Sequence, residues 1–119
     1  MLFLKPPPDF PIDWDYIQNL ADGDNEFALE LLQVFVQDLQ SQLPNLQKAI
    51  AIENYIKIQE SAHYLKGASG NVGAREMHSL MQSLEKQAKA EVIDGAELIY
   101  ATTAQYFEII SQWVASASH

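Results

Sequence analysis

The chain has 119 residues, enough for one domain with a single core, and 48% of them are apolar. It has no cysteine, which excludes disulfides and thiolate metal sites, and its net charge of −9 makes nucleic acid and anionic membranes poor partners. No run approaches the roughly 20 apolar residues of a membrane-spanning helix, so we expect a cytoplasmic protein.

The chain begins with a segment that has no hydrophobic period. Residues 1–11 are apolar and rich in proline, so we expect a leader there. A short helix then follows, with Asp13 or Asp15 as its N-cap and an end near Ala21. The Asp-Gly-Asp run at 22–24 predicts a helix stop and the N-cap of a second helix.

The second predicted helix is long and covers about 24–51. Pro44 lies inside it and predicts a kink or a break near 40–43, because proline lacks the N–H that the helix needs. Its apolar residues recur at helical spacing and form a stripe of Ala28, Leu31, Leu32, Phe35, Leu39, Leu43, Leu46 and Ile50.

Three more amphipathic helices are expected, at about 53–69, at about 74–90 and after Asp94-Gly95. Their inward residues are predicted to be Tyr55, Ile58, Ala62, Leu65 and Ser69, then Met77, Leu80, Met81, Leu84 and Ala88, then Leu98, Ile99, Thr102, Tyr106, Ile109, Ile110 and Trp113. No segment alternates at period two. We therefore predict an all-α fold, an antiparallel four-helix up-down bundle with a short additional N-terminal helix, over 12–116, with a tail at 117–119.

His63 lies on the outer side of the third predicted helix. At about 100° per residue it is roughly 140° from the centre of the apolar stripe, so its side chain should face solvent. Lys66 is one turn further on the same face, where a cation would stabilise added negative charge. A glycine inside a helix lowers stability by about 0.5–1 kcal/mol relative to alanine. The presence of Gly67 therefore suggests that a partner approaches the backbone closely beside His63. An exposed histidine without a role is the alternative.

The run from His63 to Ala74, His-Tyr-Leu-Lys-Gly-Ala-Ser-Gly-Asn-Val-Gly-Ala, resembles the signature of histidine phosphotransfer (HPt) domains. That signature is a histidine, any residue, an apolar residue and Lys-Gly, with an apolar-Gly pair closing the helix. The first two predicted helices and Leu84-Glu85 are also similar to the family, so the resemblance covers about 12–115.

The resemblance implies a phosphocarrier and not an enzyme. His63 would accept a phosphoryl group from an aspartyl phosphate on a response-regulator receiver domain and pass it to another receiver. Lys66 would offset charge on the phosphoryl oxygens, and Gly67 would give the receiver access. The implied partners are receiver domains and a hybrid histidine kinase. No cofactor is expected on this chain, because Mg²⁺ would be held by the receiver, and we expect a monomer.

Two residues of the fourth helix occupy positions that matter in the family. In several members a glutamine orients the imidazole and a cation lies one turn further, and here these positions hold Glu85 and Lys89. Glu85 departs from the pattern, since a carboxylate can accept from the ring N–H but would repel a phosphoryl group. An orienting role for Glu85 and a solvated helix charge both stay open, and so does a phosphate contact for Lys89.

A receiver would also need a docking surface. Ile56, Gln59 and Gly70 share the His63 face, and Leu29 and Val36 flank the stripe of the second helix. For Leu29 and Val36 the alternative is that they cover the short first helix.

Other functions fit the sequence less well. The glycines at 67, 70 and 73 do not have the spacing of a nucleotide-binding loop, which argues against a kinase. His63, His78 and His119 are not in metal-ligand spacing, so no metal site is predicted. A helical-bundle adaptor that binds receiver domains without phosphotransfer is the remaining alternative.

Overall fold

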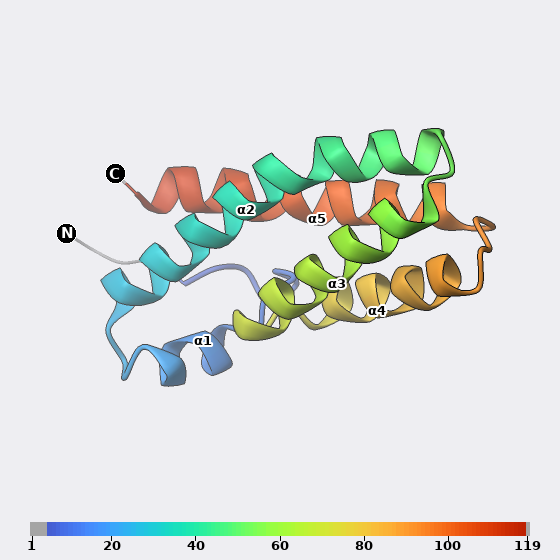
Figure 1. The fold of residues 1–119 in the computed structure, drawn as a ribbon. Coiled ribbons are helices and arrows are strands. Elements are labelled where there is room, and N and C mark those ends of the chain that lie inside the picture. The colour runs from blue at the N-terminus through green and yellow to red at the C-terminus, as the bar shows by residue number, and fades with distance from the viewer. Residues whose placement is uncertain (1–4, 119) are drawn as a thin grey trace.

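Five helices follow one another along the chain in the computed structural model, which describes residues 5–118 (Figure 1). They are α1 (Trp14–Leu20), α2 (Asn25–Ala51), α3 (Tyr55–Asn71), α4 (Arg75–Lys89) and α5 (Ala96–Ala117). Among the described residues there is no strand, and no helix combines the length and apolar character that crossing a bilayer requires.

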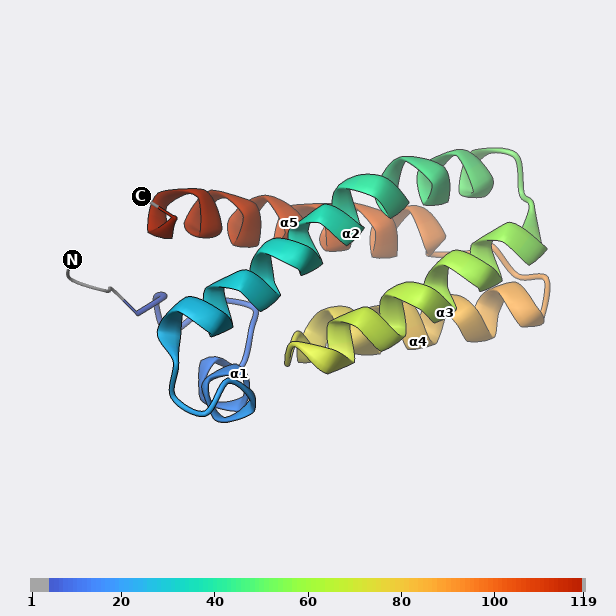
Figure 2. The same ribbon diagram turned by 60° about the vertical axis from the view of Figure 1, so that its left-hand side comes forward.

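Helices α2 to α5 form an antiparallel bundle. Helix α3 packs against α2 and α4, and α5 packs against the same two helices from the other side. Figures 1 and 2 both show α3 and α4 side by side, with the chain reversing direction at each link. The short α1 packs against α2. The prediction of an all-α four-helix up-down bundle with a short N-terminal helix is confirmed.

Polar side chains start three of the helices. Asp13, Asp24 and Asn54 each accept a hydrogen bond from the backbone N–H three residues on, at 3.1 Å in each case. Such N-caps satisfy N–H groups that have no partner within the helix. Asp13 is thus the cap of α1, and Asp24 caps α2 as predicted. Gly23, with φ +78°, makes the turn between these helices.

Helix α2 continues through Pro44, so the predicted break is wrong. Figures 1 and 2 show its axis changing direction about midway, which is the predicted kink. Proline removes one hydrogen bond of the helix, to the carbonyl of Gln40. Because Leu39, Leu43 and Leu46 are buried on either side of this point, packing holds both halves of the helix in place.

The buried face of α5 differs from the predicted one. Leu98 and Ile109 were expected inside but are 72% and 47% exposed. The buried residues of α5 are Ala96, Thr103, Ile110 and Val114. The error has a physical cause. Almost every residue of α5 is uncharged, so polarity alone does not define a narrow inward face. Leu20 of α1 is likewise exposed, at 52%.

Both ends of the described chain join the fold. Phe10 falls in the segment expected to be a leader, yet it is buried, and its ring lies 5.2 Å from that of Trp113. At the other end α5 extends through Ala117, the first residue of the predicted tail. Residues 1–4 of the leader and His119 of the tail lie outside the described residues.

Candidate functional site

His63 is on the outer face of α3, as predicted. Ile58, Ala62 and Leu65 are buried and fix the rotation of the helix. The side chain of His63 is 69% exposed as a result. A histidine buried in the core is therefore excluded, and the ring is accessible to a partner.

The ring of His63 contacts a carboxylate from the neighbouring helix. Nδ1 lies 2.8 Å from Oε2 of Glu85, which projects from α4. The side chain of Glu85 is only 8% exposed. The interpretation of Glu85 as a solvated helix charge is thus wrong, and its geometry is that of a residue that orients the imidazole.

Two lysines surround the same carboxylate. Lys66 Nζ lies 2.7 Å from Oε1 of Glu85, and Lys89 Nζ lies 3.7 Å from Oε2. The hydrogen bond from Lys66 lowers the pKa of the Glu85 carboxyl below its ordinary value of 4.5, against the opposing effect of burial, and the hydrogen bond from His63 and the charges of Lys66 and Lys89 lower it further. Glu85 is therefore ionised at neutral pH. Two lysines against one carboxylate give the site a positive balance on an otherwise acidic chain.

The charge of Glu85 assigns the tautomer of His63. An ionised carboxylate can only accept hydrogen bonds, so Nδ1 of His63 must carry the hydrogen. In the neutral ring Nε2 then carries the lone pair. Among residues 5–118 the structure gives Nε2 no hydrogen-bond partner. In that neutral form of the ring, Nε2 is the nitrogen with a lone pair available to a partner.

The two glycines beside His63 have different surroundings. A Cβ added to Gly67 would meet no atom within 4 Å, so nothing in the described chain requires glycine there. A Cβ on Gly70 would lie 3.2 Å from Nδ1 of His78. His78 donates from Nδ1 to the carbonyl of Lys66, at 2.8 Å, and so ties α4 to α3. The close contact with His78 explains why glycine is present at position 70. Nothing in the sequence pattern predicted this contact of His78.

A comparison with protein-family models matches residues 30–113 to the model described as "Hpt domain". The chain belongs to the Hpt domain family. This match covers most of the chain and includes His63, Lys66, Gly67 and Glu85. The resemblance to histidine phosphotransfer domains is confirmed at the level of the family.

Two curated relatives are proteins of phosphorelays or phosphotransfer. The phosphorelay intermediate protein rdeA of Dictyostelium discoideum is 23% identical over 112 residues, which are 91% of this chain and 44% of that protein. Histidine-containing phosphotransfer protein 2 of Arabidopsis thaliana is 29% identical over 77 residues, 62% of this chain and 49% of that protein. The Hpt domain described here thus spans about half, or less, of the length of these relatives.

Two solved structures share the fold. Histidine-containing phosphotransfer protein B of Pseudomonas aeruginosa has a TM-score of 0.81 and 22% identity, over 92% of this chain and 95% of that one. The HPT domain of a sensor hybrid histidine kinase from Shewanella has a TM-score of 0.75 and 20% identity, over 90% of this chain and 92% of that one. The five-helix arrangement of this Hpt domain is therefore that of known HPt structures.

The structure separates the predicted docking residues. Ile56 is 70% exposed on the His63 face, and Gln59 is half-buried beside it. Leu29 is half-buried and packs against the core. Val36 is buried in that core, so the prediction that it lies in an exposed docking surface is wrong. Val36 instead belongs to the core cluster, together with the stripe that it flanks.

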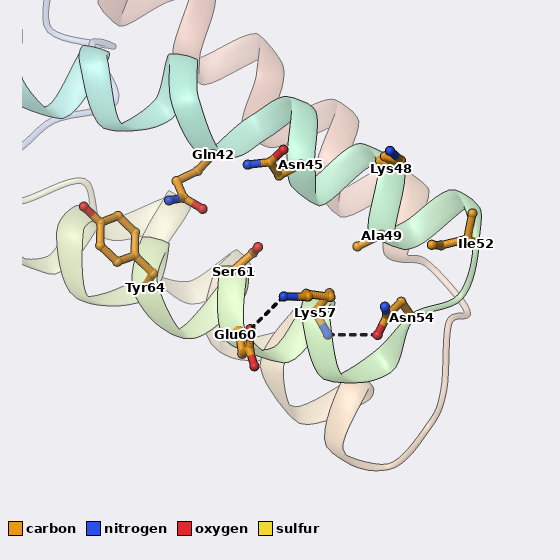
Figure 3. Close-up of a pocket in the computed structure, with 10 residues that line it drawn as sticks. All are labelled: Gln42, Asn45, Lys48, Ala49, Ile52, Asn54, Lys57, Glu60, Ser61 and Tyr64. Carbon is orange, nitrogen blue, oxygen red and sulfur yellow. Dashed lines mark hydrogen bonds and ion pairs between the residues drawn. The ribbon is translucent and has the colours of Figure 1, made fainter.

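An open groove of about 620 Å³ runs between α2 and α3 near the link that joins them (Figure 3). Its walls carry polar side chains such as Gln42, Asn45 and Tyr64, and His63 is not among the lining residues. His63 itself lies on an exposed helix face, a setting that suits a protein partner more than a small substrate. No cluster of three metal-ligating side chains is present among the described residues.

Proposed function

We propose that this Hpt domain carries a phosphoryl group on Nε2 of His63. One observation carries the proposal: an exposed imidazole whose Nδ1 is held by an ionised, buried carboxylate, so that Nε2 points outward as the nucleophile. The donor is an aspartyl phosphate on a response-regulator receiver domain, and the acceptor is an aspartate of a second receiver. A hybrid histidine kinase is the expected source of the phosphoryl group. The domain acts as a cytoplasmic monomer.

The transfer step needs geometry and charge compensation more than acid–base chemistry. Nε2 attacks phosphorus in line with the aspartyl oxygen, the N–P bond forms and the P–O bond breaks, and the electron pair leaves with the receiver's carboxylate. The proton on Nδ1 stays where Glu85 holds it. Mg²⁺ is supplied by the receiver, and this chain contributes no metal ligand.

Charge at the site supports the same chemistry. Lys66 and Lys89 lie within 4 Å of Glu85, one on each side of its carboxylate. Together they outweigh the carboxylate that would otherwise repel the phosphoryl group. We propose that both ammonium groups turn toward the phosphoryl oxygens once these are in place.

The receiver is proposed to dock over α3 around His63. Gly67 presents bare backbone there, and Ile56 offers an apolar contact two turns before His63. Gln59 lies at the edge of this face. The alternative, an adaptor that binds receivers without phosphotransfer, shares this surface but gives no reason for the outward Nε2.

Phosphotransfer profiling tests the proposal. Each receiver domain of the source organism is phosphorylated with acetyl phosphate and mixed with this chain, and acid-labile, base-stable phosphate on the chain is measured. We expect label on the wild type and none on His63→Gln. His78→Gln is the matched control, because it makes the same substitution at the half-buried histidine of α4, and it should be labelled. Magnesium and ATP alone should leave the chain unlabelled. A receiver that binds the wild type tightly without labelling it would support the adaptor, and equal labelling of His63→Gln would refute the site.

A further inference from the structure

Glu85 occupies a position where the family resemblance leads us to expect glutamine. An amide could accept a hydrogen bond from Nδ1 of His63 just as a carboxylate does, so orientation alone does not require the negative charge. The carboxylate is nonetheless buried and ionised beside the ring. Burial of a charge is unfavourable unless the charge interacts strongly with its neighbours. The ring of His63 is one of the groups with which the charge of Glu85 interacts.

The protonation state of the ring matters most after phosphorylation. Attack by Nε2 leaves the ring with a proton on Nδ1 and a phosphoryl group on Nε2, so the ring is a cation. When the group is passed on, the N–P bond breaks and its electron pair returns to Nε2. If Nδ1 still holds its proton, the leaving group is a neutral imidazole. If that proton has been lost, the leaving group is an imidazolate anion, which leaves far less readily.

Few charged groups face His63 from the elements around it. Glu85 and Lys89 approach from α4, and Lys66 lies on α3 itself. Glu60 is one turn earlier on α3, but its carboxylate pairs with Lys57 at 3.8 Å and is largely exposed. Both site lysines contact Glu85 and not the ring. The carboxylate of Glu85, 2.8 Å from Nδ1, is therefore the charge that acts most directly on the ring.

We propose that Glu85 retains the proton on Nδ1 of phosphorylated His63, and so keeps the phosphoryl group transferable at higher pH than a glutamine at this position would. This inference rests on the proposed phosphocarrier function. Glu85 acts through His63, by stabilising the cationic ring in the way that a buried aspartate stabilises the imidazolium of a serine protease. The charge has a role in releasing the group as well as in accepting it.

The test uses potassium phosphoramidate to phosphorylate His63 directly, without a receiver. Wild type, Glu85→Gln and Glu60→Gln are compared. The ¹⁵N shifts of the phosphorylated ring give its titration midpoint, and ³¹P spectra give the rate of phosphate loss against pH. We expect the midpoint of the wild type to lie about one pH unit above that of Glu85→Gln. The pH at which phosphate loss slows should move down by the same amount in Glu85→Gln.

Glu60→Gln removes the same charge one turn away, without contact to the ring, and should titrate like the wild type. A midpoint that is unchanged in Glu85→Gln would overturn the inference, and so would an equal shift in Glu60→Gln, which would make the effect one of general charge. Absence of phosphate from His63 in the wild type would refute the proposed function and this inference with it. A purely structural role of Glu85 would alter unfolding by urea but not the titration of the ring.

Discussion

Glu85 is a buried acid whose two oxygens contact three basic side chains. Oε1 accepts from Lys66, and Oε2 lies near both His63 and Lys89. If such a group were completely buried, removal of one of its partners would lower the free energy of unfolding by about 3–5 kcal/mol. The side chains of His63 and Lys89 are 69% and 57% exposed, so water screens part of the interaction. We expect Glu85→Gln to destabilise the domain by about 1–2 kcal/mol at neutral pH.

The contribution of Glu85 should depend on pH with a definite sign. Its pKa is lower in the folded chain than its ordinary value of 4.5, so the unfolded chain binds the proton more readily. The stabilisation is therefore complete above the pKa of Glu85 in the unfolded chain. It is lost as the pH falls through the lower pKa of Glu85 in the folded chain. Urea unfolding from pH 7 to pH 3 should show the gap between wild type and Glu85→Gln closing below about pH 5. A gap that stays constant over this range would contradict the assignment.

Gly67 and Gly70 form a matched pair for substitution by alanine. The Cβ of Gly67→Ala enters open space, so the variant should gain about 0.5–1 kcal/mol in its free energy of unfolding. In Gly70→Ala the Cβ would press on His78 at 3.2 Å, so the gain should be smaller or absent. Urea denaturation measures both. Gly67→Ala should also accept phosphate from a receiver more slowly than the wild type, and a loss of stability in Gly67→Ala would show that the space is not free.

Among the elements, α1 is held by one residue in three ways. Asp13 caps α1, its carboxylate pairs with Arg75 at 2.9 Å, and its N–H donates to the carbonyl of Gly73 at 2.8 Å. Gly73 has φ +77°, and a Cβ there would come within 2.9 Å of Tyr16. These contacts dock the first helix on the turn between α3 and α4, next to the end of the helix that carries His63.

Two N-cap aspartates allow the docking of α1 to be measured. Asp24→Ala removes a cap alone and should cost about 1 kcal/mol. Asp13→Ala removes a cap and the ion pair with Arg75, and should cost about 1–2 kcal/mol, the pair adding little because it is partly exposed. Equilibrium unfolding gives both values. In the Asp13→Ala background, Arg75→Gln should cost less than about 1 kcal/mol, because only the contact of Arg75 with the ring of Tyr16, 5.9 Å from its centroid, remains to be lost. A larger cost would mean that Arg75 has a further partner.

In the whole molecule, α3 and α5 lie on opposite sides of the bundle. Each packs against α2 and α4, and α3 and α5 are not neighbouring helices in the bundle. The face around His63 is therefore separate from the outer face of α5. Each helix has an aliphatic residue of similar exposure, Ile56 of α3 at 70% and Leu98 of α5 at 72%. Because the two side chains are similarly exposed, Leu98 is a control for Ile56 in a test of where the receiver docks.

Truncation of each residue tests where the receiver docks. Ile56→Ala should weaken binding of the receiver that labels His63 fastest by about five- to tenfold, because interface residues of this kind contribute about 1 kcal/mol or more. Leu98→Ala should change the dissociation constant by less than twofold. Isothermal titration calorimetry measures both. The reverse order of effects would place the docking surface on α5.

Much of the fold follows from local signals in the sequence. Asp13 and Asp24 begin helices because their side chains accept hydrogen bonds from N–H groups three residues further along. This interaction needs no residue from another part of the chain. The exposure of His63 follows from its angle to Ile58, Ala62 and Leu65 on the same helix. Leu98, in contrast, was misplaced because helix α5 offers more apolar positions than its two neighbours cover.

The sequence by itself determined the helices, the exposure of His63 and the adjacent Lys66-Gly67, because these depend on residues within one or two turns of each other. Only the tertiary structure decided that Glu85 is buried against His63 and shared with Lys66 and Lys89. His63 and Glu85 are on different helices, 22 positions apart. Their contact depends on the rotation and depth at which α4 packs on α3, and these are properties of the whole core.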